Sequence, residues 1–179
     1  MDTLFTHPPV LGFAACSGSG KTTLLTALLP MLVDAKLRVA VIKHSHHDFE
    51  IDRPGKDSYR LRKAGARQML IASPWRSALI TEQPDRREPE LADLLLQLDR
   101  TRLDLVLVEG FRHSAFPKIE IHRAATGKPL LHCEDDSIIA VASDTDIDTT
   151  LPRLNLDRPQ DVAKFILDYL QSIPNGVPA

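Results

Sequence analysis

The chain has 179 residues and a net charge of −2 at pH 7, and 43% of its residues are hydrophobic. This length suits one domain over residues 1–179 with a substantial core, and we expect flexible tails at 1–8 and 174–179. The charge offers no basic field for nucleic acid, and no apolar run is long enough to cross a membrane. Two cysteines and an N-terminus without signal-peptide character predict a cytoplasmic protein without a disulfide framework.

Strand-like and helix-like apolar patterns alternate along the chain, which is typical of an α/β fold with a mostly parallel sheet flanked by helices. The strand-like runs lie at residues 10–15, 39–42, 69–72, 77–81, 103–108, 118–122 and 138–142. We expect the run LDLVLV at 103–108 to be central because it is almost wholly apolar. The run at 118–122 alternates polar and apolar residues, which predicts a half-exposed strand.

The helix-like segments start after residue 23 and lie over 57–64, 91–98 and 162–170. Pro30 lies inside the first segment, so we expect a kink or an early end there. The short helix at 57–64 has Asp57 as its expected cap and Gly65 as its stop. The closing helix is amphipathic, with a cap expected near Asp157.

The segment ACSGSGKTT joins the first strand-like run to the first helix. It matches the phosphate-loop pattern G-x-x-x-x-G-K-[ST], with Ala15 in place of the first glycine. Backbone N–H groups in such a loop form a nest for anions, and the helix dipole adds to it. We expect Lys21 to reach the β- and γ-phosphates, Thr22 to bind Mg²⁺ and Thr23 to contact the α-phosphate. The residues predicted to bind nucleotide here are Cys16, Ser17, Gly18, Ser19, Gly20, Lys21, Thr22 and Thr23.

Acidic residues follow several strand-like runs, and ligands gather at the carboxyl ends of strands in open α/β sheets. Glu109 comes directly after LDLVLV, so it is predicted to act with Lys21 in catalysis and with Thr22 at Mg²⁺. Asp48, in the segment KHSHHDFE, is predicted to contact Mg²⁺ through water. Asp144 could accept hydrogen bonds from N1 and N2 of guanine, or it could simply end a strand in a turn.

Two other features leave alternative functions open. His44, His46 and His47 could bind a transition metal, as in a metal chaperone, although adjacent histidines are unusual for zinc. The basic stretch at 53–67 is either a solvated helix face or a mobile segment that binds a second anion. With that stretch as a lid over an acceptor, the same phosphate loop would serve a small-molecule kinase.

The segments ACSGSGKTTLL, IKHSHHDFEIDRPGKDSYRLRKAGA, LDLVLVEGFRH and IIAVASD together resemble the MobB family, the molybdopterin-guanine dinucleotide biosynthesis adapters. The resemblance covers residues 10–170 and implies a three-layer P-loop NTPase fold. It also implies GTP binding, weak GTPase activity and a homodimer that assists a MobA-type molybdenum cofactor guanylyltransferase, with molybdopterin as a candidate further ligand. The positions that match the family's motifs are Gly18, Gly20, Lys21, Thr22, Thr23, Glu109 and Gly110.

Overall fold

The structure is a computed structural model that describes residues 3–45, 48–83, 85 and 87–173. Contacts divide the chain into two compact units, as far as the described residues define them. The first unit comprises Met1–His44 and Glu90–Ala179, and the second comprises Ser45–Pro89. The expectation of one domain over the whole chain stays a prediction. The tail expected at 174–179 lies outside the described residues.

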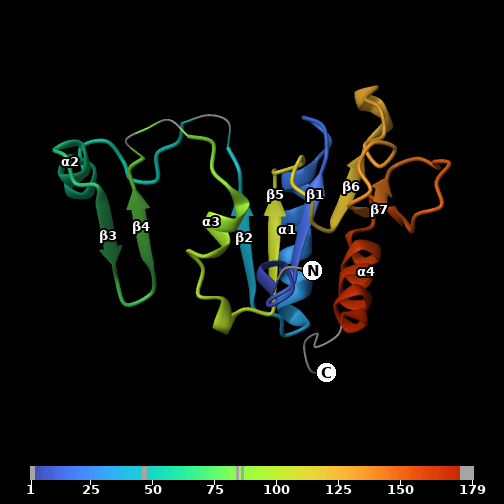
Figure 1. Ribbon diagram of the computed structural model, residues 1–179, viewed down its shortest axis with the longest axis horizontal. Coiled ribbons are helices and arrows are strands. Elements are labelled where there is room, and N and C mark those ends of the chain that lie inside the picture. Colours follow the sequence, from blue (N-terminus) through green and yellow to red (C-terminus); the bar gives the residue numbers. More distant parts are fainter. Residues whose placement is uncertain (1–2, 46–47, 84, 86, 174–179) are drawn as a thin grey trace. The chain divides into compact units, whose positions relative to one another are not determined.

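The first unit is built around a parallel sheet, which within the described residues has six strands in the order β2-β5-β1-β6-β7-β8 (Figure 1). Every neighbouring pair in this order is parallel. The strands are β1 (Val10–Ala14), β2 (Val39–Lys43), β5 (Leu105–Glu109), β6 (Lys118–His122), β7 (Ile138–Ser143) and β8 (Arg153–Asn155). The predicted α/β class is therefore confirmed. Sequence patterning misses β8 because its three residues, RLN, include a single apolar side chain.

Apolar side chains form cores on both faces of the sheet, because alternate side chains of a strand point to opposite faces. Leu105 and Leu107 of β5 belong to one core, and Val106 and Val108 belong to the other. The first core also contains the buried leucines of α1 (Lys21–Asp34) and the apolar stripe of α4 (Pro159–Ser172). The second core is closed by α3 (Leu91–Leu95). Helices thus cover both faces, which gives the three layers expected from the sequence.

Helix boundaries differ in places from the expected ones. α1 continues past Pro30 to Asp34, so the expected early end is wrong. Pro30 is exposed, and the helical carbonyl that its ring leaves without an N–H partner can bind water instead. α4 begins with Pro159 at its first position, where a missing N–H costs nothing, and its N-cap is Arg158, next to Asp157 as expected. None of the helices among the described residues combines the length and apolar character needed to cross a bilayer.

The described N-terminal residues contact other parts of the first unit. The ring of Phe5 stacks on Phe116 with a centroid distance of 6.1 Å. The guanidinium of Arg100 donates a hydrogen bond of 2.8 Å to the carbonyl of Leu4. The stretch from Leu4 therefore makes specific contacts, where the sequence suggests a flexible tail.

The second unit contains α2 (Asp57–Lys63) and an antiparallel hairpin of β3 (Gln68–Ala72) and β4 (Ser77–Thr81). Asp57 is the first residue of α2 rather than its cap, which is Lys56. A second difference concerns the basic stretch at 53–67, whose Arg62 side chain is only 5% exposed and pairs with three carboxylates of the same unit. Its acidic partners are Asp52 at 2.7 Å, Glu50 and Glu82.

This arginine joins segments that are separate in the sequence. Arg62 connects the chain before α2 to the residue that follows β4. The hydrogen bonds that Arg62 donates to Asp52 and then to Glu82 raise the pKa of Arg62, and the bond to Asp52 holds the pKa of that carboxyl below its usual value. Arg62 therefore stabilises the second unit through internal ion pairs and is not free to bind an external anion.

Strand β6 is more buried than its alternating sequence suggests. Lys118 and Glu120 are each 1% exposed, so the expectation of a half-exposed strand is wrong. The Lys118 ammonium donates to the carbonyls of Arg112 and Ser114 at 3.0 and 2.6 Å, and it pairs with Asp135 at 2.9 Å. Buried charges are tolerated when they are paired and hydrogen-bonded in this way.

The Glu120 carboxylate is satisfied by the loop before β7. It accepts hydrogen bonds from the backbone N–H groups of Leu131 at 2.7 Å and His132 at 3.0 Å. The Nδ1 atom of His132 lies 2.8 Å from the same carboxylate. The polar side chains of β6 thus anchor the loops on either side of the strand, which explains why they occupy the middle of the sheet.

We expect Lys118→Met to lower the free energy of unfolding by about 3–5 kcal/mol, because it leaves buried carbonyls and Asp135 without their cation. Urea denaturation at pH 7 measures this loss. Lys164→Met is the matched control, since it removes an exposed ion pair with Asp168 that should contribute about 0.5 kcal/mol or less. Equal losses in the two variants would contradict an anchoring role for Lys118.

Candidate functional site

The carboxyl ends of three neighbouring strands meet at one edge of the sheet. Glu109, the last residue of β5, is in register with Phe13 of β1 on one side and with Lys43 of β2 on the other. The loop at 15–20 begins two residues after Phe13. The structure therefore brings the predicted phosphate loop and the predicted acidic residue together, as expected for ligands at strand ends.

The loop at 15–20 owes its shape to its glycines. Gly18 and Gly20 have φ values of 84° and 88°, a conformation that other residues rarely adopt. A Cβ atom at either position would meet no other atom within 4 Å, so the loop is open on that side. The Ser19 side chain is buried, and its hydroxyl donates to the carbonyl of Cys16 at 2.9 Å. The loop is thus held by an internal hydrogen bond, and its glycine side is accessible to a ligand.

α1 begins immediately after this loop. The Leu24 N–H donates to the carbonyl of Gly20 at 3.0 Å, the first bond of the regular helical pattern. The N–H groups that precede it therefore have no helical acceptor and point out of the N-terminus. The Lys21 ammonium lies 3.2 Å from the carbonyls of both Ala15 and Cys16, so it spans the loop from its far side. N–H donors, one cation and an open approach are the features that a polyphosphate requires.

Glu109 has a partner that the sequence did not suggest. The Lys43 ammonium is 2.9 Å from each of the Glu109 carboxylate oxygens. The Glu109 side chain is 12% exposed and that of Lys43 is 56% exposed, so the pair is reached from the lysine side. Lys43 could have been found only by knowing that β2 lies next to β5, because 66 positions separate the two residues.

Gly110 shapes the chain directly after Glu109. Its φ is 105°, and a Cβ atom there would lie 2.7 Å from the Cβ of His44. The His44 ring stacks on Phe111 with a centroid distance of 4.7 Å, and the backbone N–H of His44 donates to the Glu109 carbonyl at 2.9 Å. His44 therefore packs against the end of β5.

The predicted histidine cluster is described only in part. His46 and His47 lie outside the described residues. Among the residues that are described, no group of histidines, cysteines or acidic side chains has an arrangement that could hold a metal. The metal-chaperone alternative therefore gains no support from the part of the chain that can be seen.

The remaining predicted site residues lie in different surroundings. Asp48 belongs to the second unit, is exposed and accepts the N–H of Phe49 at 2.9 Å. Its contact with Mg²⁺ stays a prediction.

Asp144 follows β7, and both of its oxygens accept hydrogen bonds: from the N–H of Ala124 at 2.9 Å and from the guanidinium of Arg123 at 3.2 Å. Arg123 is a further site residue that sequence reasoning missed.

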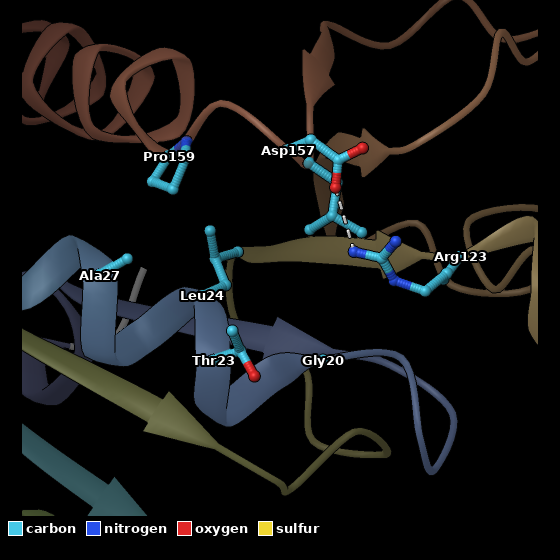
Figure 2. A pocket seen from close by; sticks show the side chains of 8 residues that line it. Gly20, Thr23, Leu24, Ala27, Arg123, Asp157 and Pro159 are labelled. Atoms are coloured by element: carbon cyan, nitrogen blue, oxygen red, sulfur yellow. Dashed lines mark hydrogen bonds and ion pairs between the residues drawn. The ribbon is translucent and has the colours of Figure 1, made fainter.

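A cavity of about 350 Å³ adjoins the loop (Figure 2). It lies between the first turns of α1, represented by Thr23, and the segment that connects β8 to α4, represented by Asp157. Arg123 lies at the same end of the cavity as Asp157 and donates to it at 3.3 Å. Asp144 is not among the residues that line this space in the described chain.

Comparison with protein families gives one clear assignment. The family model described as Molybdopterin guanine dinucleotide synthesis protein B, MobB, matches residues 10–144 of the chain. This chain belongs to the MobB family. The match contains both the phosphate loop and Glu109, and it confirms the resemblance inferred from the sequence.

Known MobB-family proteins are similar over almost the whole chain. The molybdopterin-guanine dinucleotide biosynthesis adapter protein of Escherichia coli K12 is 46% identical over 164 residues, which are 91% of this chain and 94% of that protein. The adapter protein of Haemophilus influenzae is 44% identical over 90% of this chain and 89% of that protein. A crystal structure of molybdopterin-guanine biosynthesis protein B superposes with a TM-score of 0.71 at 29% identity, covering 90% and 99% of the two chains.

We expect Gly110→Ala to destabilise this MobB-family chain by about 2 kcal/mol or more, because it combines a strained φ with an overlap at His44. Gly127→Ala is the matched control, since Gly127 also has a positive φ, 61°, but no neighbour within 4 Å. Gly127→Ala should lower the free energy of unfolding by about 1 kcal/mol. Thermal unfolding of both variants measures the difference. Equal destabilisation of the two variants would show that Gly110 does not lie close to His44.

Proposed function

We propose that this chain is a GTP-binding adapter of molybdopterin guanine dinucleotide biosynthesis with weak, Mg²⁺-dependent GTPase activity. The observation that carries the proposal is the loop at 15–20, open on its glycine side and spanned by Lys21, with Glu109 on the adjacent strand. The names of the relatives from Escherichia coli and Haemophilus influenzae support the adapter role.

In this proposal the chain's own residues bind and orient the nucleotide. The N–H groups of the loop and of the first turn of α1 donate to phosphate oxygens, and Lys21 supplies a point charge. The hydroxyl of Thr22 and the carboxylate of Glu109 are oxygen ligands of the kind that Mg²⁺ prefers. Bound Mg²⁺ would neutralise charge on the phosphates. Thr23 and Asp48 keep their predicted roles, toward the α-phosphate and toward Mg²⁺ through water.

Weak hydrolysis follows from how Glu109 is held. Both oxygens of its carboxylate are bound by Lys43, so Glu109 can orient a water molecule only in competition with that ammonium. An arginine finger supplies about 10³–10⁵ of the rate in other NTPases, and the sequence offers no obvious one. Slow turnover suits an adapter, because the nucleotide-bound state then lasts long enough to engage another protein.

The partners in this proposal are those that the resemblance implies. They are a second copy of the chain in a homodimer, a MobA-type guanylyltransferase and, as a candidate further ligand, molybdopterin. The small-molecule kinase is less well supported, because Arg62 of its supposed lid is buried in ion pairs within the second unit. Transfer of the γ-phosphate to an added hydroxyl acceptor, instead of slow release to water, would favour the kinase.

Lys21→Ala tests nucleotide binding directly. We expect the affinity for Mg²⁺-GTP, measured by calorimetry, to fall about 10- to 100-fold, because a charge-assisted contact to the phosphates is lost. The affinity for guanosine should not change. Lys164→Ala, which removes an exposed lysine of α4, is the control. The proposal fails if the folded wild-type chain takes up no Mg²⁺-GTP.

Glu109→Gln tests the proposed hydrolysis. We expect the rate of phosphate release to fall by about 10²-fold, since the amide cannot act as a base or neutralise Mg²⁺ in the same way. The dissociation constant for Mg²⁺-GTP should change much less. Glu134→Gln, at an exposed position, should leave both quantities unaltered. An unchanged rate in Glu109→Gln would remove Glu109 from the site.

A further inference from the structure

The cavity beside the phosphate loop has apolar walls and one polar end. Its sides are apolar: Figure 2 shows Leu24 and Ala27 of α1 on one side and Pro159 of α4 on the other. Leu24 and Leu156, which also line it, are 4% and 5% exposed, so these walls are part of the core. A pocket of about 350 Å³ with apolar walls and few polar groups is typical of a small-molecule site.

The cavity is continuous with the phosphate loop. Gly20, the last residue of the loop, and Thr23, in the first turn of α1, both line it. A nucleotide whose phosphates lie on the loop would therefore extend its ribose and base into this space. The polar end of the cavity, formed by Arg123 and Asp157, would face the edge of the base.

We propose that this cavity holds the nucleobase and that Asp157 is the residue that selects guanine. This inference rests on the proposed function, because it assigns the base-recognition part of the same nucleotide site. Asp157 is supplied by the segment between β8 and α4, and no motif in the sequence marks it as a nucleotide-binding residue.

The contacts of Asp157 leave it free to read a base. Its side chain is 64% exposed. One oxygen accepts a hydrogen bond from Arg123 at 3.3 Å, and the structure gives no hydrogen bond to the other oxygen among the described residues. The backbone N–H of Asp157 donates to the side chain of Asn155 at 2.9 Å, which holds the backbone of this segment. The carboxylate is therefore positioned but incompletely bonded.

The chemistry of a carboxylate favours guanine over adenine. An ionised carboxylate can only accept hydrogen bonds, and guanine presents two donors side by side, N1–H and the N2 amino group. Adenine has a lone pair at N1, which would face the negative charge of Asp157. Arg123 uses one N–H for Asp144 and one for Asp157, and its remaining donors suit the O6 and N7 acceptors of guanine.

This assignment replaces the direct role suggested for Asp144 by the sequence. Both oxygens of Asp144 already accept hydrogen bonds, from Ala124 and from Arg123, and its side chain is 14% exposed. Asp144 is thus a positioning residue that holds the Arg123 guanidinium toward Asp157.

Asp157→Asn gives a test with a gain of binding. Calorimetry with GTP, ATP and xanthosine triphosphate, each with Mg²⁺, should show that the variant loses about 10-fold or more in affinity for GTP. It should gain affinity for xanthosine triphosphate, because the amide can donate to the C2 carbonyl of xanthine while still accepting N1–H. Binding of ATP should change little, and a gain of binding cannot come from a misfolded chain.

Two further variants complete the experiment. Asp161→Asn removes the same charge in the first turn of α4, at a residue that does not line the cavity, and should keep the wild-type order of affinities. Asp157→Ala should show a smaller preference for GTP over ATP than the wild type and gain nothing for xanthosine triphosphate. This variant tests the role of Asp157 in selectivity independently, in case Asp157→Asn does not fold well.

The outcomes separate the two proposals. If the wild type binds Mg²⁺-GTP and either folded Asp157 variant keeps the wild-type preference for GTP over ATP, this inference is overturned and the proposed function stands. Equal binding of GTP and ATP by the wild type, or an equal loss of all three nucleotides in Asp157→Asn, would also overturn it. No binding of any triphosphate by the wild type would instead overturn the proposed function.

Discussion

The parallel register of β2, β5 and β1 is the constraint on which the site depends. It sets the end of β1, and hence the loop after it, beside Glu109, and it sets Lys43 on the other side of that carboxylate. Residues far apart in the sequence reach one edge of the sheet because parallel strands all end there. The apolar runs on β5 and β1 are therefore functional as well as structural, since a slip of one residue would turn Glu109 to the opposite face.

Much of the fold could be predicted from apolar periodicity. Runs such as LDLVLV indicate buried strands, and leucines at helical spacing indicate α1, because both patterns report directly which side chains need burial. The position of the candidate phosphate loop between a strand and a helix could be predicted, because a glycine-rich turn followed by lysine and threonine is typical of such a junction. Glu109 could be predicted because a charged residue at the end of an apolar strand is unusual.

The rest depends on long-range pairing, which local patterns do not contain. Lys118 and Glu120 suggest a half-exposed strand, yet each is buried because the loops on either side of β6 fold back and supply hydrogen-bonding partners. Arg62 suggests a basic surface, but its charge is neutralised by Asp52, which precedes α2, and by Glu82, which follows β4. The contacts of Lys43, Arg123 and Asp157 could not be predicted from local patterns, because the sheet order brings their partners together.

The buried ammonium of Lys118 has a consequence for how nucleotide state could be transmitted. It holds the carbonyls of Arg112 and Ser114, so the stretch after Gly110 cannot shift without separating a charge from its partners in the protein interior. The Lys43 side chain, by contrast, is 56% exposed. In the proposed nucleotide-bound state, a metal ion on the Glu109 carboxylate would compete with the Lys43 ammonium, and that ammonium could move into solvent without leaving a buried charge unpaired.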